Sequence, residues 1–373
     1  MAWQGASMAQ EHGRGVLATG KVNYFEWCRA LGALAVLLLH TFIEMTNHVL
    51  PQLLVAGADA GAITCRIASY ELIETLLTRW AVPVFLMISG ALLLSPKKKM
   101  RPHYVWHYAS RMIFVLAVFG TCFAAIKLHV EGVPLGIALV AQALVLTLTA
   151  RTWEHLWYLY ALLGLYLLLP LLRLLVARAS RWQLLGVILA LAVATMVVPA
   201  VLSLQKGELP SAGITVTQYL PSVVYFLLGY YVHTFLRWWK DRSGRILAVA
   251  GVASLAIACV ASVSGVYIGA ERGMFYLPFS PLTCLFSVAY FLWVRQALDS
   301  NDIREHRFFD CIARYSFGIY VLHVLFLHAA PRLVNLAALP AGVAEATVFV
   351  VALVGSLALT WLLRRIPIFR RYL

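Results

Sequence analysis

The chain has 373 residues, of which 62% are hydrophobic and 12% are charged, and its mean hydropathy is +0.82. Water-soluble domains carry about 25% charged residues, so this chain has too few charges to cover a surface that faces water. Because backbone groups inside a bilayer must be hydrogen-bonded within the segment, the composition predicts an all-α, polytopic integral membrane protein.

The formal charge of +14 does not indicate a nucleic-acid partner, because of where the basic residues lie. Lysine and arginine gather in short clusters between apolar runs, for example at 97–101 and 364–371. This placement is typical of cytoplasmic loops and leaves membrane lipids as the expected surroundings. None of the six cysteines has a metal-ligand spacing, so no metal site is predicted.

Residues 1–22 are polar and glycine-rich, and we interpret them as a disordered cytoplasmic tail that precedes a single transmembrane domain over 23–373. Apolar runs of about 20 residues predict spanning helices. Ten such runs are found, at 27–46, 74–94, 105–127, 155–176, 183–203, 217–236, 246–268, 276–297, 313–332 and 341–363. Residues 47–73 are expected to form the longest outer loop.

One further apolar stretch, 134–150, is ambiguous by length alone. The loops 95–111 and 177–182 on either side of this region are both basic and are therefore both expected in the cytoplasm. An even number of crossings must separate them, so 134–150 is predicted not to span. The count of ten spans then places the N- and C-termini in the cytoplasm.

The first span carries three polar residues at membrane depth, where such groups are costly and often functional. Arg29 and His40 are eleven positions apart, about three helical turns, and therefore share one face. Glu44 lies one turn beyond His40 and is a candidate to orient its imidazole. An arginine suits a phosphate and a histidine suits general-base chemistry, but the same residues could instead snorkel or join helices.

The second span contains Pro83, which should kink it, followed by Ser89 and Gly90. Ser89 and Gly90 permit close approach, either of a bound cofactor or of a neighbouring helix. Arg79 should lie near the outer face, where it could contact an acceptor or anchor the helix.

Two later spans carry further candidates for substrate binding. His155 and Trp157 open the fourth span at its outer boundary, where aromatic belts are also common. Tyr320 and His323 share one face of the ninth span. We expect His323 near the middle of the membrane, either in a site or in a structural hydrogen bond.

Taken together, these segments resemble the acyltransferase family three of bacterial membranes. The resemblance is carried in order by Arg29 with His40, by Val82–Gly90, by His155–Trp157 and by Ser316–His323. It covers residues 24 to about 364, and the length most resembles the stand-alone WecH-like and IcaC-like O-acetyltransferases.

The resemblance implies that acyl-CoA, usually acetyl-CoA, is a co-substrate and that no cofactor is tightly bound. The acceptor would be a hydroxyl of a cell-surface glycan or of its lipid-linked precursor, modified at the bacterial inner membrane. Arg29 carries over as the ligand of the CoA phosphates and His40 as the catalytic base. The cytoplasmic RxxR pattern of many family members at the start of the third span is not present in this sequence, and only Arg111 remains from it as a donor-binding candidate.

A different class of function is a transporter or flippase for an acylated glycan or lipid intermediate. Such proteins usually show paired broken helices in two related halves. In this sequence we interpret one span, at Pro83, as kinked by proline, and it has no clear partner in a second half, which favours the acyltransferase.

Overall fold

The computed structural model describes residues 23–96, 102–206, 216–236, 242–268, 277–299, 307–340 and 342–373. All regular elements of these residues are helical, which confirms the predicted all-α class. The helices are α2 (Asn23–Glu44), α3 (Leu50–Val55), α4 (Ala60–Leu77), α5 (Ala81–Leu93), α6 (Pro102–Val115), α7 (Thr121–Val130), α8 (Ile137–Leu148), α9 (Trp157–Arg178), α10 (Arg181–Ala192), α11 (Val198–Lys206), α12 (Val216–Phe235), α13 (Arg242–Ile268), α14 (Pro281–Asp299), α15 (Arg307–Leu333), α16 (Val343–Leu363) and α17 (Pro367–Tyr372). The predicted tail, residues 1–22, lies outside the described residues.

Short π-helical segments join several of these helices into longer rods. They occupy Met45–Val49, Leu116–Gly120 and Val193–Val197. Within the described ranges, nine helical rods are long and apolar enough to cross a membrane. The predicted span 217–236 corresponds to α12, which has 20 residues but carries more polar side chains and packs among other helices.

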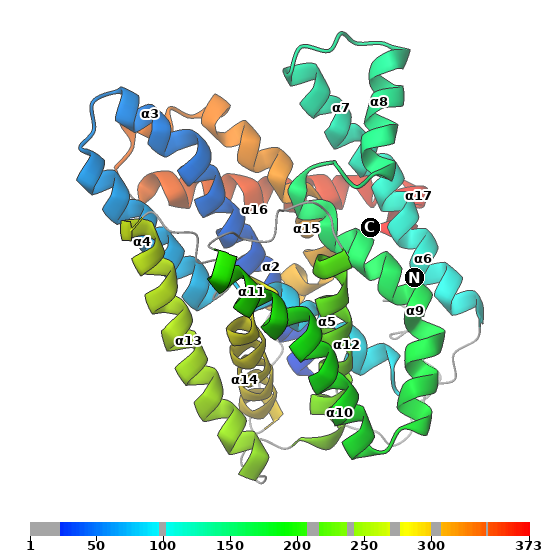
Figure 1. Ribbon diagram of the computed structural model, residues 1–373. Helices are drawn as coiled ribbons and strands as arrows, with labels where there is room; N and C mark the ends of the chain where they lie inside the picture. The colour runs from blue at the N-terminus through cyan, green and yellow to red at the C-terminus, as the bar shows by residue number, and fades with distance from the viewer. Residues whose placement is uncertain are drawn as a thin grey trace.

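Helix α8 has 12 residues and is the short apolar helix expected between the third and fourth spans. At 1.5 Å per residue it extends about 18 Å, too little to cross a hydrocarbon core of about 30 Å. The prediction that 134–150 does not span is therefore confirmed. Helices α7 and α8 form a hairpin that projects from one end of the molecule (Figure 1).

The expected outer loop at 47–73 is wrong, because most of it is helical. The first rod continues through α3 to Val55, and α4 begins at Ala60, where the Asp59 carboxylate accepts a hydrogen bond from the backbone N–H of Ala62. Polar residues that suggested a loop find partners here instead: Arg66 binds Glu345 of α16 at 2.6 Å. Ion pairs with other helices thus allow polar residues to lie in a helix in a region that the sequence predicted to be a loop.

The expected irregularity at Pro83 is present as a break between α4 and α5 at residues 78–80. Proline at position 83 has no N–H for the carbonyl of Arg79, so a straight helix through this point would lose a hydrogen bond. The backbone N–H groups of Thr78 and Arg79 both bond the carbonyl of Glu74 instead.

Helix α2 is the centre of the molecule, since it contacts α4, α5, α14, α15 and α16. Beside it, α5 packs on α12 with two glycines at the crossing. A Cβ built on Gly90 would lie 1.8 Å from the carbonyl oxygen of Phe226, and one on Gly229 would lie 1.9 Å from that of Met87. This close approach fixes α5 against the bundle.

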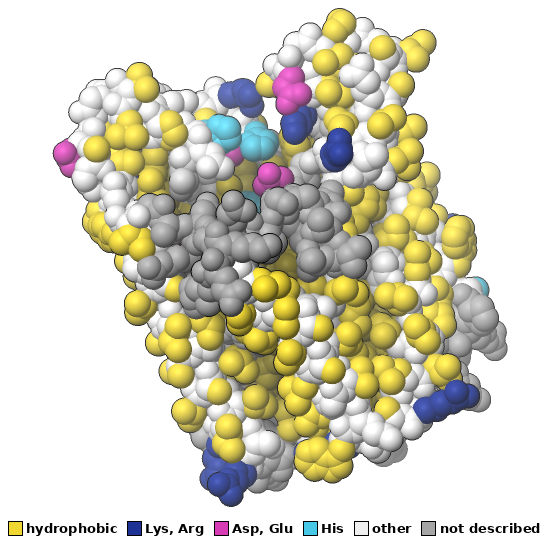
Figure 2. Space-filling model, in the orientation of Figure 1, with side chains coloured by type: hydrophobic (Ala, Val, Ile, Leu, Met, Phe, Trp, Pro, Cys, Tyr) yellow, Lys and Arg dark blue, Asp and Glu magenta, His cyan; other side chains and the backbone are white. Residues whose placement is uncertain are grey.

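Large apolar side chains cover the outside of the bundle. Exposed examples are Leu171 on α9, Trp182 on α10, and Val249 and Val252 on α13. Figure 2 shows hydrophobic side chains over a broad band of the visible face, with lysine and arginine towards its ends. A surface of this kind is stable in lipid rather than in water, as expected for a multi-pass membrane protein.

Candidate active site

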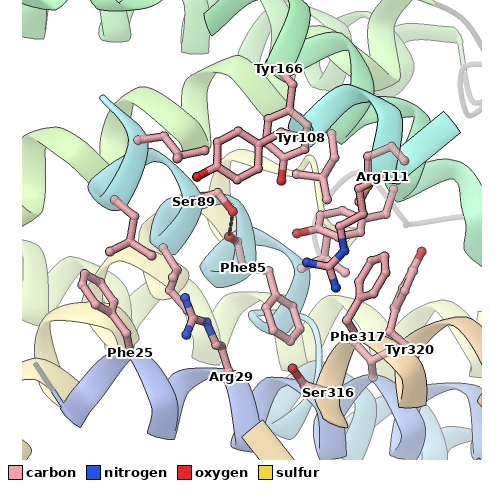
Figure 3. A pocket seen from close by; sticks show the side chains of 18 of the residues that line it. Phe25, Arg29, Phe85, Ser89, Tyr108, Arg111, Tyr166, Ser316, Phe317 and Tyr320 are labelled. Atoms are coloured by element: carbon pink, nitrogen blue, oxygen red, sulfur yellow. Dashed lines mark hydrogen bonds between the residues drawn. The ribbon is translucent and has the colours of Figure 1, made fainter. Parts of the chain in front are cut away.

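A cavity of about 290 Å³ opens between α2, α5, α6, α9 and α15 (Figure 3). These helices come from distant parts of the sequence, so the cavity exists only once the bundle is packed. Its lining consists of Phe25, Glu26, Arg29, Val36, Val82, Phe85, Ile88, Ser89, Leu92, Leu93, Tyr108, Arg111, Met112, Tyr158, Leu162, Tyr166, Ser316, Phe317 and Tyr320.

Two arginines predicted to bind the donor, Arg29 and Arg111, reach this cavity from different helices (Figure 3). Arg29 is buried on α2, and its guanidinium lies 2.5 Å from the Glu26 carboxylate. Arg111 on α6 stacks over the ring of Phe317 at 4.3 Å. With one acidic and two basic lining residues, this region of the cavity is suited to an anion such as a phosphate.

Arg111 also holds the end of the chain. Its Nε and Nη2 atoms donate hydrogen bonds to the carbonyl oxygens of Tyr372 and Leu373, at 2.8 and 3.2 Å. The C-terminal residues of α17 therefore lie beside the arginine-containing part of the cavity. Sequence reasoning gave no indication of this contact, because 261 positions separate Arg111 from Tyr372.

Aromatic residues of α6 and α9 form another part of the lining. The ring centroids of Tyr108 and Tyr166 are 5.4 Å apart, and those of Tyr158 and Tyr320 are also 5.4 Å apart. Except for Tyr320, the sequence analysis missed them. Tyr158 and Tyr166 are eight residues apart, slightly more than two helical turns, and this spacing could have indicated a shared face.

Three histidines predicted separately meet at one point. The ring centroids of His40 and His323 are 5.1 Å apart, those of His155 and His323 are 5.3 Å apart, and those of His40 and His155 are 6.3 Å apart. We call His40, His155 and His323 the histidine cluster. It draws on α2, α15 and the turn that precedes α9.

The histidine cluster adjoins the cavity without lining it. Val36, one turn before His40, and Tyr320, one turn before His323, are both lining residues. The Tyr320 hydroxyl donates a hydrogen bond to the backbone carbonyl of His155. His40 and His323 thus lie side by side but do not line this cavity, whereas the second span contributes to the cavity and not to the cluster.

Backbone hydrogen bonds orient two of these imidazoles. His323 Nδ1 lies 3.0 Å from the carbonyl oxygen of Ile319 and 2.7 Å from that of Tyr320, and His155 Nε2 lies 3.3 Å from that of Val321. Because a carbonyl only accepts, these ring nitrogens carry the protons. In a neutral ring the opposite nitrogens, His323 Nε2 and His155 Nδ1, are then proton acceptors. Both are buried and have no hydrogen-bond partner among the described residues.

Glu44 does not orient His40 as expected. Its carboxylate lies 2.8 Å from His328 Nδ1 and 3.9 Å from His48 Nε2. The close packing of α15 against α2 brings His328 within direct reach, and this contact takes the place of the local one predicted from spacing. Sequence reasoning missed both histidines, although His48 is four positions from Glu44 and His328 is five from His323.

Gly90 is not part of the cavity, in contrast to Ser89. The Ser89 hydroxyl, which lines the cavity, donates a hydrogen bond to the carbonyl of Phe85 at 3.0 Å. Gly90 instead faces the backbone of α12. Of the two roles left open for Gly90, the structure therefore gives it helix packing.

Arg79 and Trp157 were candidates for binding the acceptor, but neither lines the cavity. Arg79 is buried, 2.7 Å from the Glu74 carboxylate and 3.6 Å from that of Glu71, so its charge is balanced inside the protein. The Trp157 ring packs edge-on against Phe279 at 5.2 Å and is not a cavity residue.

Comparison with known protein families identifies the family of the chain. The acyltransferase family 3 model, described as an acyltransferase domain, matches residues 22–365, nearly the whole chain. No curated protein and no solved structure gives a significant match. The matched region includes the five cavity helices and the histidine cluster.

Proposed function

The chain belongs to acyltransferase family 3 and is thus a multi-pass membrane acyltransferase, and from this premise we propose a specific reaction. The protein transfers an acyl group, acetyl in the first instance, from acyl-CoA to a hydroxyl group. The acceptor hydroxyl belongs to a cell-surface glycan or its lipid-linked precursor, and the membrane is the bacterial inner membrane. Within the family, we assign the chain to the stand-alone WecH-like and IcaC-like type as part of this proposal.

One observation carries this proposal: the cavity is lined by two arginines and adjoins the histidine cluster. Arg29 and Arg111 supply fixed cationic forks that suit the phosphates of a CoA donor. The histidine cluster lies just beyond Val36 and Tyr320 of the same cavity. Arg29 and His40 are separated by about 16 Å along α2, so a long donor can bind at one end and react at the other.

The proposed chemistry uses His40 as general base. Its unprotonated nitrogen takes the proton of the acceptor hydroxyl while the oxygen attacks the thioester carbonyl. An ester C–O bond forms, the C–S bond breaks, and the CoA thiolate leaves and takes up a proton. His155 and His323, which contact His40, hold further acceptor nitrogens beside the reacting group.

The direct test uses purified protein, radiolabelled acetyl-CoA and a panel of glycan acceptors. We expect label in an acceptor product with the wild-type protein and little with His40→Ala. Acetyl-CoA that is neither bound nor consumed with any acceptor would contradict the proposal. Transport of an acylated glycan across vesicles without acyl transfer would instead support the transporter or flippase function.

A further inference from the structure

A second group of metal-binding side chains lies further along α2 than the histidine cluster. Glu44, His48 and His328 each offer one ligand atom, and these three atoms all lie within 4.8 Å of one another. The Glu44 carboxylate is buried, whereas the His48 and His328 side chains are 54% and 36% exposed. The group is therefore fixed on one side and accessible on the other.

Local irregularities bring these residues together. The π-helical segment Met45–Val49 contains His48 and ends two residues before Pro51, whose missing N–H interrupts regular helical bonding. Such π segments are rare and frequently occur at functional sites. His328 comes from α15. The ring of Trp153, which precedes α9, packs edge-on against the His328 ring, with the ring centroids 5.1 Å apart.

The ligand types and spacings suit a transition-metal ion. Two histidines and one glutamate form a known three-residue set for catalytic zinc, which leaves a fourth position open. In a tetrahedral site with bonds of about 2.0–2.1 Å, neighbouring ligand atoms lie about 3.3 Å apart. The Glu44–His328 and Glu44–His48 separations of 2.8 and 3.9 Å lie on either side of that value, and the ligand atoms of His48 and His328 lie within 4.8 Å of each other. The side chains would therefore have to rotate to reach ideal geometry, which the exposure of both histidines permits.

We propose that Glu44, His48 and His328 bind a divalent transition-metal ion of the zinc type, with one coordination position open to water or a ligand. His328 bonds through Nδ1, so its proton occupies Nε2 or leaves when the metal binds. Glu44 is four residues from His40, about 6 Å along the helix axis. The proposed metal site therefore lies about one helical turn beyond His40 of the histidine cluster.

The competing explanation is a simple hydrogen-bonded pair between Glu44 and His328. Both explanations account for the 2.8 Å contact, but only a metal site gives His48 a required role. His48 is more than half exposed, so His48→Ala removes a ligand without opening the core.

The experiment uses full-length protein purified with a tag that contains no histidine and stripped of metal with a chelator. Zinc binding is measured by calorimetry, and cobalt is added as a spectroscopic probe of coordination. We expect one ion per chain, cobalt bands typical of a four-coordinate site, and affinity lowered by about tenfold or more in His48→Ala and His328→Ala. Glu44→Gln should weaken binding similarly.

His129→Ala is the matched control, since His129 is an exposed histidine of α7 whose ring lies 3.2 Å from the carbonyl oxygen of Val133. It should bind metal like the wild type. Absence of stoichiometric binding, or equal affinity in the His48 and His129 variants, would overturn the proposal and leave the hydrogen-bonded pair. Metal binding is measured without acyl transfer. The metal site can therefore fail this test while the proposed acyl-transfer reaction stands, and the reverse also holds.

Discussion

At the scale of single residues, an experiment on the histidine cluster can distinguish a catalytic role of His40 from a purely structural one. His40→Ala should reduce acyl transfer by a factor of roughly 10²–10⁴, about 3–5 kcal/mol of barrier, because it removes the nitrogen that takes the proton of the acceptor hydroxyl. Folding yield and acyl-CoA binding should stay near wild type. The three quantities are measured on one preparation, with His129→Ala as the control.

If His40 only joins helices, stability and all activities should fall together. Normal turnover in His40→Ala would remove it as the base and direct attention to His323, whose Nε2 is a buried acceptor without a partner among the described residues.

Arg29 carries a second prediction at this scale. Arg29→Ala should weaken acyl-CoA binding, and Arg29→Lys should recover only part of it, because lysine binds phosphate as a point charge rather than with a planar fork. Binding is measured by calorimetry with a non-hydrolysable acyl-CoA analogue. Arg245→Ala, at an exposed position of α13, is the control, and an affinity for Arg29→Ala equal to that of the control would exclude Arg29 from the donor site.

At the scale of elements, the crossing of α5 and α12 depends on Gly90. A Cβ at this position would meet the Phe226 carbonyl oxygen at 1.8 Å, and a backbone atom of a packed helix cannot rotate away. Gly90→Ala should therefore destabilise the protein by about 1–3 kcal/mol or more through overpacking. The measurement is thermal unfolding in detergent.

Gly164→Ala on α9 is the matched control, since no atom lies within 4 Å of a Cβ built there. It should leave the unfolding temperature nearly unchanged or raise it slightly, because alanine favours helix more than glycine does. Equal unfolding temperatures for the two variants would show that α5 and α12 can separate without cost.

At the scale of the whole molecule, the charge pattern predicts which ends of the bundle face the cytoplasm. Leu135 is exposed in the connection between α7 and α8, and Cys311 is exposed near the start of α15. In cells that carry variants with a single cysteine, an impermeant maleimide should label Leu135→Cys but not Cys311. Labelling of Cys311 in intact cells, with no labelling of Leu135→Cys, would show that the protein has the opposite orientation in the membrane.

The sequence by itself determined the class of fold and the extent of most helices. Hydropathy is sufficient for this, because a segment in lipid must satisfy its own backbone hydrogen bonds as helix. The basic loops also indicated that the region of α8 does not span. The sequence pointed to Arg29, His40 and His323, since polar groups within predicted spans stand out against an apolar background. His155 was found at the outer boundary of a span, and Arg111 through the resemblance to the family.

Only the tertiary structure decided how these candidates group. Helix packing placed Arg29 and Arg111 in one cavity, and it brought three histidines from distant segments to one point. It gave Glu44 a partner on α15 and turned Gly90 towards α12. Spacing along one helix fixes which residues share a face, but the neighbour that this face meets depends on contacts between residues hundreds of positions apart.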